Sequence, residues 1–330
     1  MSNEMIIQST DELNETFNRI AIDQISTNDN LETDIVWIVS CSINFVGSLV
    51  TCLVLTTWKN IHSATITLLA ALMVSEMTSA GFLIFFNFWH MYYTVTKESE
   101  LMTARRCSFL AGLQYIPSCA SWALSLAIAI DRLNAVFRQA KYQELTKWSV
   151  RVKISVAVVW GLLYYIIMVS CTPNTYLLTV CSGRLLYFDD YKVKNFLVIL
   201  TTTNTCTTIV IYLFILVVVR FKASKWVEPK STASDNNNLA AVKKIRSQQL
   251  TKALTFTCLS YASTTIIEKT VGLFFITFAP DLQYRVGVYV GTLGTLEGVN
   301  TFVGCCLFMT EFRKGLKNLV DVASKKMCNQ

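Results

Sequence analysis

The stretch Ile35–Thr57 reads IVWIVSCSINFVGSLVTCLVLTT and carries no charged side chain. About 20 mostly apolar residues in a helix cross the roughly 30 Å hydrocarbon core of a bilayer. Six further apolar runs follow along the chain: Ala64–Trp89, Cys107–Ile130, Ile154–Cys171, Asn195–Val219, Ala253–Ile276 and Val286–Met309. The pattern predicts an all-α bundle of seven transmembrane helices.

The composition agrees with lipid as the solvent around most of the chain. Of the 330 residues, 53% are hydrophobic and only 15% are charged, whereas roughly a quarter of the residues of an average soluble domain are charged. The segments between the apolar runs are too short to form a separate soluble domain. We therefore expect a polar extracellular segment over 1–34, one transmembrane domain over 35–309 and a cytoplasmic tail over 310–330.

The tail is expected to form a short amphipathic helix on the membrane surface. Apolar residues recur in it at helical spacing, namely Phe312, Leu316, Leu319 and Val320, with basic residues between them. A plain juxtamembrane anchor would show the same pattern, and the two interpretations are compatible.

Basic residues are distributed unequally between the two sides of the predicted bundle. The tail and the loops after spans one, three and five hold 20 Lys and Arg residues, against eight on the other side. Because Lys and Arg accumulate in cytoplasmic loops, the N-terminus should lie outside and the C-terminus in the cytoplasm of a multi-pass plasma-membrane protein. Asn14-Glu15-Thr16 is a glycosylation acceptor on the expected outer segment. The net charge of +7 is then explained by a basic inner face that anionic lipids attract, so no nucleic-acid partner is expected.

The cysteines do not follow a metal-binding pattern. Seven of the 11 lie scattered in apolar runs, where they are interpreted as small packing residues. Cys107, Cys171 and Cys181 lie near the outer, oxidising side, where a disulfide can form. The sequence predicts no metal site built from cysteine.

Asp131-Arg132, at the inner end of the third run, is the sharpest local signal. An arginine inside a bundle is costly unless it is paired, and the adjacent carboxylate can neutralise it. Loosening the pair would expose Arg132 to a partner, as expected for an element with two states that a ligand can bias. The plainer alternative is that Arg132 extends to the interface and only anchors the span.

Three acids lie within the predicted spans, where a charge is costly and is seldom kept without a role. Glu268 stands beside Lys269 toward the outer end of span six, either as an interfacial anchor or as a ligand contact. Glu76 and Glu297 lie deeper. They could form hydrogen bonds between helices, or line the proton path of a transporter.

The stretch Ala129–Val136 resembles the Asp-Arg-Tyr motif of rhodopsin-like G-protein-coupled receptors, with Leu133 in place of the tyrosine. Cys107, 25 residues before Arg132, and Trp160 in the fourth span also fall where that family places these residue types. The resemblance runs from about Val46 to Leu319 and is nearest to the divergent nematode serpentine chemoreceptors. It implies a chemosensory receptor that couples to a heterotrimeric G protein.

The resemblance also implies roles for individual residues. Residues expected to contribute to G-protein coupling are Asp131, Arg132, Tyr142 and Tyr212. An intramembrane polar network, with a sodium ion near Glu76, is expected from Ser48, Glu76, Glu297 and Asn300. The expected disulfide joins Cys107 to Cys181, because Cys171 sits at the end of span four.

The expected ligand pocket lies in the outer half of the bundle. Its candidate residues are Gln114, Tyr115, Ser118 and Glu268. Gln114 occupies the place of the aspartate that binds ammonium groups in amine receptors, so a biogenic amine is disfavoured. A small molecule or a short peptide suits such a pocket, although ordinary packing between helices would account for the same residue types.

The chain departs from the family where activation switches are usual. Asn204 stands in place of a proline, the stretch over 258–261 lacks a Trp and a Pro, and Asn300-Thr301 replaces Asn-Pro. A receptor-like protein that no longer signals is therefore one alternative.

A secondary transporter is the other alternative, but no inverted repeat is apparent in the sequence. An enzyme is not expected, because the chain has only two histidines and lacks a His-Glu-X-X-His zinc motif and a nucleophile elbow.

Overall fold

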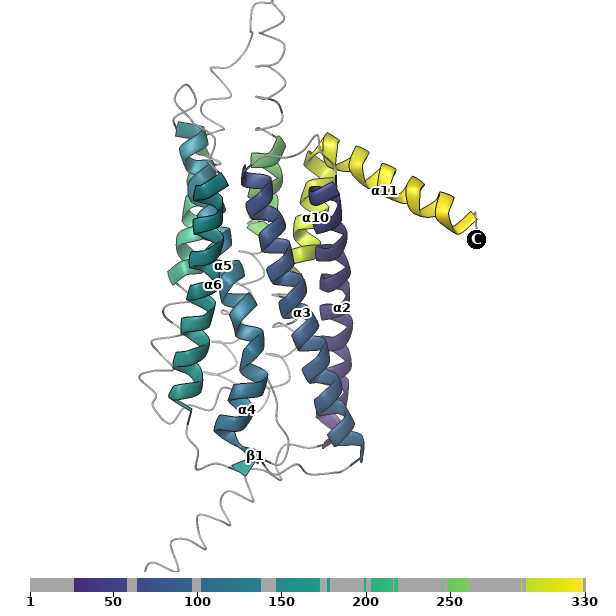
Figure 1. Cartoon of the computed structure of the whole chain (residues 1–330), viewed down its shortest axis with the longest axis vertical. Helices are drawn as coiled ribbons and strands as arrows, with labels where there is room; N and C mark the ends of the chain where they lie inside the picture. Colours follow the sequence, from purple (N-terminus) through teal and green to yellow (C-terminus); the bar gives the residue numbers. More distant parts are fainter. Residues whose placement is uncertain are drawn as a thin grey trace, which may run out of the picture.

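The computed structural model describes residues 27–57, 64–96, 102–137, 147–172, 177–178, 203–215, 249–257 and 295–328, with isolated positions at 199, 217–218, 245, 259–260 and 292. The long helices run side by side as one bundle, with β1 near one end and α11 at the other (Figure 1). The first, second and fourth spans are α2 (Thr27–Thr57), α3 (Ala64–Thr96) and α6 (Lys147–Ser170).

The third span changes helix type along its length. It consists of α4 (Ala104–Ala111), the 3₁₀ turn η2 (Gly112–Gln114) and α5 (Tyr115–Phe137). The change immediately precedes Pro117, a residue that has no backbone N–H to offer a helix. The outer part of this span is thus a separate short helix set on top of a long one.

Four helices of the described residues are long and apolar enough to cross a membrane: 31–57, 65–93, 105–137 and 147–170. A shorter apolar helix covers 203–215 within the predicted fifth span. The inner half of the predicted seventh span is α10 (Glu297–Phe308), and α11 (Thr310–Cys328) follows it. The all-helical bundle and the amphipathic helix after the seventh span are confirmed.

The helices extend beyond the apolar runs that predicted them. α2 begins at Thr27 rather than Ile35, α3 continues past Trp89 to Thr96, and α6 begins at Lys147 rather than Ile154. Hydropathy marks only the part of a helix that lies in hydrocarbon, whereas backbone hydrogen bonding continues into the polar flanks.

The bundle is apolar both inside and outside, as expected for helices in lipid. Inside, α2, α3, α5 and α10 enclose a core that includes the fully buried side chains of Leu68, Leu69, Leu124 and Ile128. On α6, Val156 and Ile166 are more than half exposed and face away from that core. Packing between spans therefore depends on shape and on polar contacts more than on apolar burial.

Many hydroxyl groups within the spans bond to their own helix. Threonine Oγ1 donates to the carbonyl four residues earlier in these pairs: Thr51 to Gly47 (2.7 Å), Thr208 to Asn204 (3.0 Å), Thr257 to Ala253 (3.0 Å) and Thr301 to Glu297 (3.0 Å). These bonds satisfy donors that lipid cannot satisfy.

The outer end of the third span is tied to the fourth. Thr172 receives the Arg105 Nε–H at its carbonyl oxygen over 3.1 Å, and Thr172 Oγ1 donates to Ser108 Oγ over 3.2 Å. Strand β1 (Met102–Thr103) pairs antiparallel with β2 (Leu177–Leu178) just outside. This end of the bundle is therefore held by the loop that follows span four.

Helix α11 turns away from the bundle after a buried anchor (Figure 1). The Phe312 side chain is fully buried in the core, and Leu316 and Leu319 pack against the same cluster. Lys314 Nζ lies 3.2 Å from Glu311 Oε1 on the polar face. Of the four apolar positions that predicted this helix, Phe312, Leu316 and Leu319 thus face the bundle, whereas Val320 is more than half exposed.

We predict that Gly161→Ala destabilises the fold by about 1–3 kcal/mol, the usual cost of overpacking. A Cβ at Gly161 would lie 2.2 Å from the carbonyl oxygen of Ile116, so α6 would have to move away from α5. The measurement is thermal unfolding of the purified protein in detergent. Gly81→Ala is the matched control, because its nearest neighbour would be a Phe45 ring atom at 3.8 Å. Equal unfolding temperatures for the two variants would contradict the close approach.

Candidate functional site

The inner end of α5 carries a buried ion pair. Arg132 Nη2 lies 2.6 Å and Nε 3.1 Å from Asp131 Oδ2, and both residues are almost completely buried. Two N–H groups of one guanidinium therefore meet a single carboxylate oxygen. Hydrogen bonds between charged groups are stronger than neutral ones, which makes this a well-defined closed arrangement.

Thr65, in the first turn of α3, completes the pair. Its Oγ1 donates to Asp131 Oδ2 over 2.7 Å and accepts a hydrogen bond from Arg132 Nη2. The hydroxyl thus bridges acid and base from a second helix. Thr65 could not be predicted from the sequence, because one threonine at the start of a span carries no signal of its own.

The end of α5 also contacts the fifth span. The rings of Phe137 and Phe214 stack with their centroids 5.5 Å apart. Tyr212, two residues before Phe214, is buried within the bundle. Asp131, Arg132 and Tyr212 all lie in the described part of the chain, whereas the predicted loop residue Tyr142 lies outside it.

The two deep acids lie near each other in the middle of the bundle. Glu76 on α3 has the side chains of Ser121 and Asn44 as hydrogen-bonding neighbours. Glu297 Oε1, on α10, accepts a hydrogen bond from Ser125 Oγ over 3.3 Å. The two carboxyl groups are close enough to interact electrostatically. The structure thus brings together two predicted members of the polar network and adds two serines and an asparagine.

Within the described part of the chain, the other two predicted members form no hydrogen bond to either acid. Ser48 Oγ is buried without a hydrogen-bond partner and lies against Gly298. Asn300 donates its backbone N–H to the carbonyl oxygen of Leu296 over 2.9 Å. Asn44, one helical turn before Ser48, bonds to the backbone of the seventh span at Gly298, and Ser40, one turn earlier, donates to the carbonyl oxygen of Thr292 over 3.2 Å. The sequence did not predict a role for Asn44 either, because one amide in an apolar run does not reveal which helix it faces.

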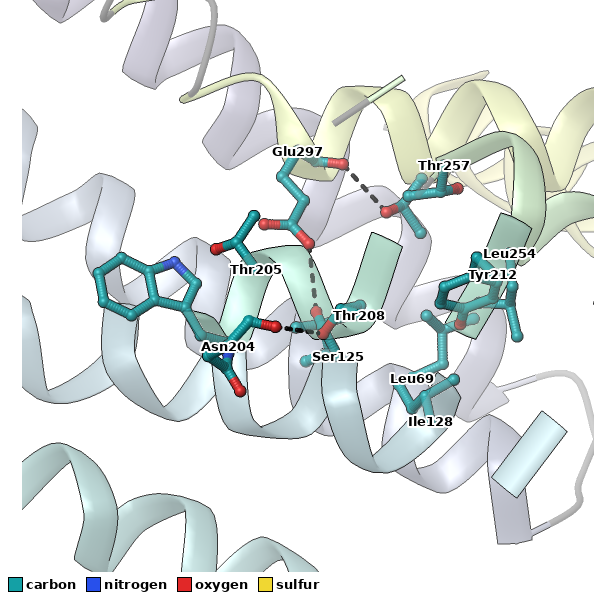
Figure 2. A pocket seen from close by; sticks show the side chains of 13 residues that line it. Leu69, Ser125, Ile128, Asn204, Thr205, Thr208, Tyr212, Leu254, Thr257 and Glu297 are labelled. Atoms are coloured by element: carbon teal, nitrogen blue, oxygen red, sulfur yellow. Dashed lines mark hydrogen bonds between the residues drawn. The ribbon is translucent and has the colours of Figure 1, made fainter. Parts of the chain in front are cut away.

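A small cavity opens beside Glu297 (Figure 2). It leaves ≈ 40 Å³ for water-sized molecules, which is room for roughly three waters. Apolar side chains from α3, α5 and span six form part of the lining. Polar residues of α5 and of spans five to seven form the rest: Ser125, Asn204, Thr205, Thr208, Tyr212, Thr257, Glu297 and Thr301. Its size suits hydration of the buried carboxylate rather than a drug-sized ligand.

The predicted ligand residues of the third span point toward different helices. Ser118 Oγ lies 2.6 Å from Ser79 Oγ on α3. The Tyr115 ring instead packs against Tyr164 of α6 with the centroids 6.0 Å apart. Gln114 is buried within η2. The fourth candidate, Glu268, lies outside the described residues.

Cys107 is disulfide-bonded, whereas Cys171 is a free thiol. The predicted partner Cys181 lies outside the described residues, as does the predicted glycosylation site Asn14. The pairing of Cys107 with Cys181 stays a prediction.

Comparison with known proteins agrees with this architecture. The family model "7 transmembrane receptor (rhodopsin family)" matches residues 47–286. The crystal structure of squid rhodopsin superimposes with a TM-score of 0.62 at 15% sequence identity, covering 91% of this chain and 88% of that one. A comparison with curated proteins finds no match. The extent of the family match shows that this chain, a multi-pass membrane protein, belongs to the rhodopsin family of seven-transmembrane receptors and is a receptor rather than an enzyme.

Proposed function

We propose that the protein is a chemosensory receptor of the plasma membrane that binds an extracellular small molecule or short peptide and activates a heterotrimeric G protein. Its N-terminus lies outside and its C-terminus in the cytoplasm, in keeping with the excess of Lys and Arg on the inner loops. The family as a whole supports a G protein and an extracellular ligand as partners.

The observation that carries the proposal is the closed arrangement of Asp131, Arg132 and Thr65. Two groups hold Arg132 at the inner end of the bundle: the Asp131 carboxylate of α5 and the Thr65 hydroxyl of α3. A ligand that binds more tightly to a state in which this arrangement opens shifts the population toward that state. Arg132 then becomes available to a cytoplasmic partner, together with Tyr142 and the basic loop ends.

The ligand is proposed to bind in the outer half of the bundle. Gln114, Tyr115 and Ser118 of the third span, together with Glu268 of span six, are proposed to contact it. The hydrogen bonds of Thr172 with Arg105 and Ser108 tie α4 to the outer end of α6, which supports a pocket with a fixed wall on this side. The disulfide proposed between Cys107 and Cys181 would fasten the outer loop across it.

A sodium ion near Glu76 is also part of the proposal. Hard cations prefer oxygen ligands, and the Glu76 carboxylate, the Ser121 hydroxyl and the nearby Glu297 carboxylate would offer them. The buried Ser48 hydroxyl, which has no hydrogen-bond partner, adds a further oxygen nearby. The residues present therefore fit such an ion.

We predict that Arg132→Ala abolishes G-protein activation. The experiment measures basal and ligand-panel activation in cells, with the native chain and the variant matched for surface expression. Activation by the native chain that disappears in the variant supports the receptor mechanism. Ion- or proton-linked uptake without coupling to any G protein would instead favour a transporter, and neither activity would favour a receptor-like protein that no longer signals.

We predict that Thr65→Val raises basal G-protein activation several-fold. The substitution removes a hydrogen bond to each charged partner, and such bonds contribute about 1.5–3 kcal/mol. Thr56→Val is the control, because Thr56 Oγ1 bonds only within its own helix, to the carbonyl oxygens of Cys52 and Leu53, and is exposed. Basal activity that stays unchanged in Thr65→Val, or that rises equally in both variants, would refute the closing role of Thr65.

A further inference from the structure

The inner half of span seven begins inside the bundle. Helix α10 starts at Glu297, after a turn in which Thr295 N–H donates to the carbonyl oxygen of Thr292 over 3.2 Å. The first N–H groups of a helix have no partner within that helix. Inside a membrane-spanning bundle they need one from elsewhere, because lipid provides none. Leu296, at the cap position, supplies no side-chain bond.

Asn44 of α2 supplies the missing partner. The backbone N–H of Gly298 donates to Asn44 Oδ1 over 2.7 Å, and both residues are buried. The start of α10 is therefore capped by a side chain from a different helix. The bond joins span one to span seven at the depth of the two acids.

The contact leaves no room for movement of α10 toward α2. A Cβ at Gly298 would lie 1.9 Å from Ser48 Oγ and 2.7 Å from Asn44 Oδ1. Gly47 faces Val299 in the same way, because a Cβ added at Gly47 would lie 3.2 Å from the Val299 Cα atom. The two helices touch closely here, so a shift of α10 away from α2 breaks the Asn44 bond.

The other end of the Asn44 amide faces Glu76. An asparagine side chain has an acceptor oxygen and an N–H₂ donor group, and its orientation is fixed by the partners of both. With the oxygen bonded to Gly298, the N–H₂ group is directed to the Glu76 carboxyl. A continuous path of polar contacts thus runs from α3 through α2 to the backbone of α10.

We propose that Asn44 is a positioning residue that holds the inner half of span seven through the Gly298 amide, while Glu76 keeps the Asn44 side chain in the orientation that this requires. A change at Glu76, such as binding or loss of a cation, then reaches the Gly298 amide through the Asn44 side chain. The effect on signalling rests on the proposed function, whereas the effect on the α10 backbone does not.

The test is hydrogen–deuterium exchange of the purified full chain, followed in peptides that cover 295–300. Asn44→Leu should accelerate exchange there about tenfold, the factor that corresponds to about 1.4 kcal/mol. Exchange in α6 should stay unchanged. Asn44→Ala replaces Asn44→Leu if the larger apolar side chain prevents folding. Ser42→Ala is the matched control, because Ser42 Oγ bonds within its own helix, to the Ile38 carbonyl over 2.7 Å.

The role of Glu76 is tested in the same assay. Glu76→Gln keeps an oxygen that can accept from the Asn44 amide and should preserve protection at 295–300, whereas Glu76→Leu should lose it. The double variant Asn44→Leu/Glu76→Leu should exchange no faster than Asn44→Leu alone, since both act through one path. Native exchange in Asn44→Leu, or additive effects in the double variant, would overturn the proposal.

A parallel measurement of G-protein activation separates this proposal from the proposed function. Accelerated exchange in Asn44→Leu together with higher basal activation supports both. Accelerated exchange in a chain that activates no G protein supports the role of Asn44 and refutes the coupling. Native exchange in Asn44→Leu, in a chain whose activation still depends on Arg132, refutes the role of Asn44 alone.

Discussion

The seam between α3 and α5 is the interaction on which the rest of the bundle depends. Three polar contacts follow one another along it: Thr65 with Asp131, Glu76 with Ser121, and Ser79 with Ser118. The two helices are antiparallel, and each step forward along α3 matches a step back along α5. Lipid offers these groups no alternative partners, so a sliding of either helix by one turn would break all three contacts together.

This register places the functional groups at fixed depths. At the inner end it sets Thr65 against the Asp131–Arg132 pair. In the middle it sets Glu76 beside Asn44 and near Glu297, where the first and seventh spans meet the seam. Because the register resists sliding, we expect changes of state in this receptor to involve helices outside the seam, such as α10. Helix α10 contacts the seam through Glu297, whose Oε1 accepts from Ser125 Oγ, and it contacts α2 through Gly298.

The sequence predicted the number and order of spans well, because the length of an apolar run depends only on bilayer thickness. It also predicted the Asp131–Arg132 pair, since the partners are adjacent in the chain. Thr65, Asn44 and Ser125 were not predicted, because their partners lie on other helices. Contacts between helices depend on how each helix is rotated about its axis and how deep it lies in the membrane. The hydropathy of a single sequence does not predict either. For the same reason, the sequence pointed to Ser48 of the first span for the polar network and not to Asn44, which bonds to span seven.

The threonines that bond to their own helix have a consequence for how the chain enters the membrane. Residues 201–208 read TTTNTCTT, a stretch that a hydropathy scale scores as poorly suited to lipid. Once Thr207 and Thr208 donate to Thr203 and Asn204, their hydroxyl donors are satisfied internally and their methyl groups remain to face the surroundings. The free-energy cost of inserting the fifth span into lipid therefore depends on the hydrogen bonds of the folded helix and not on the hydropathy of its residue types alone. Helix formation in this span must accompany or precede its transfer from the translocation channel into lipid.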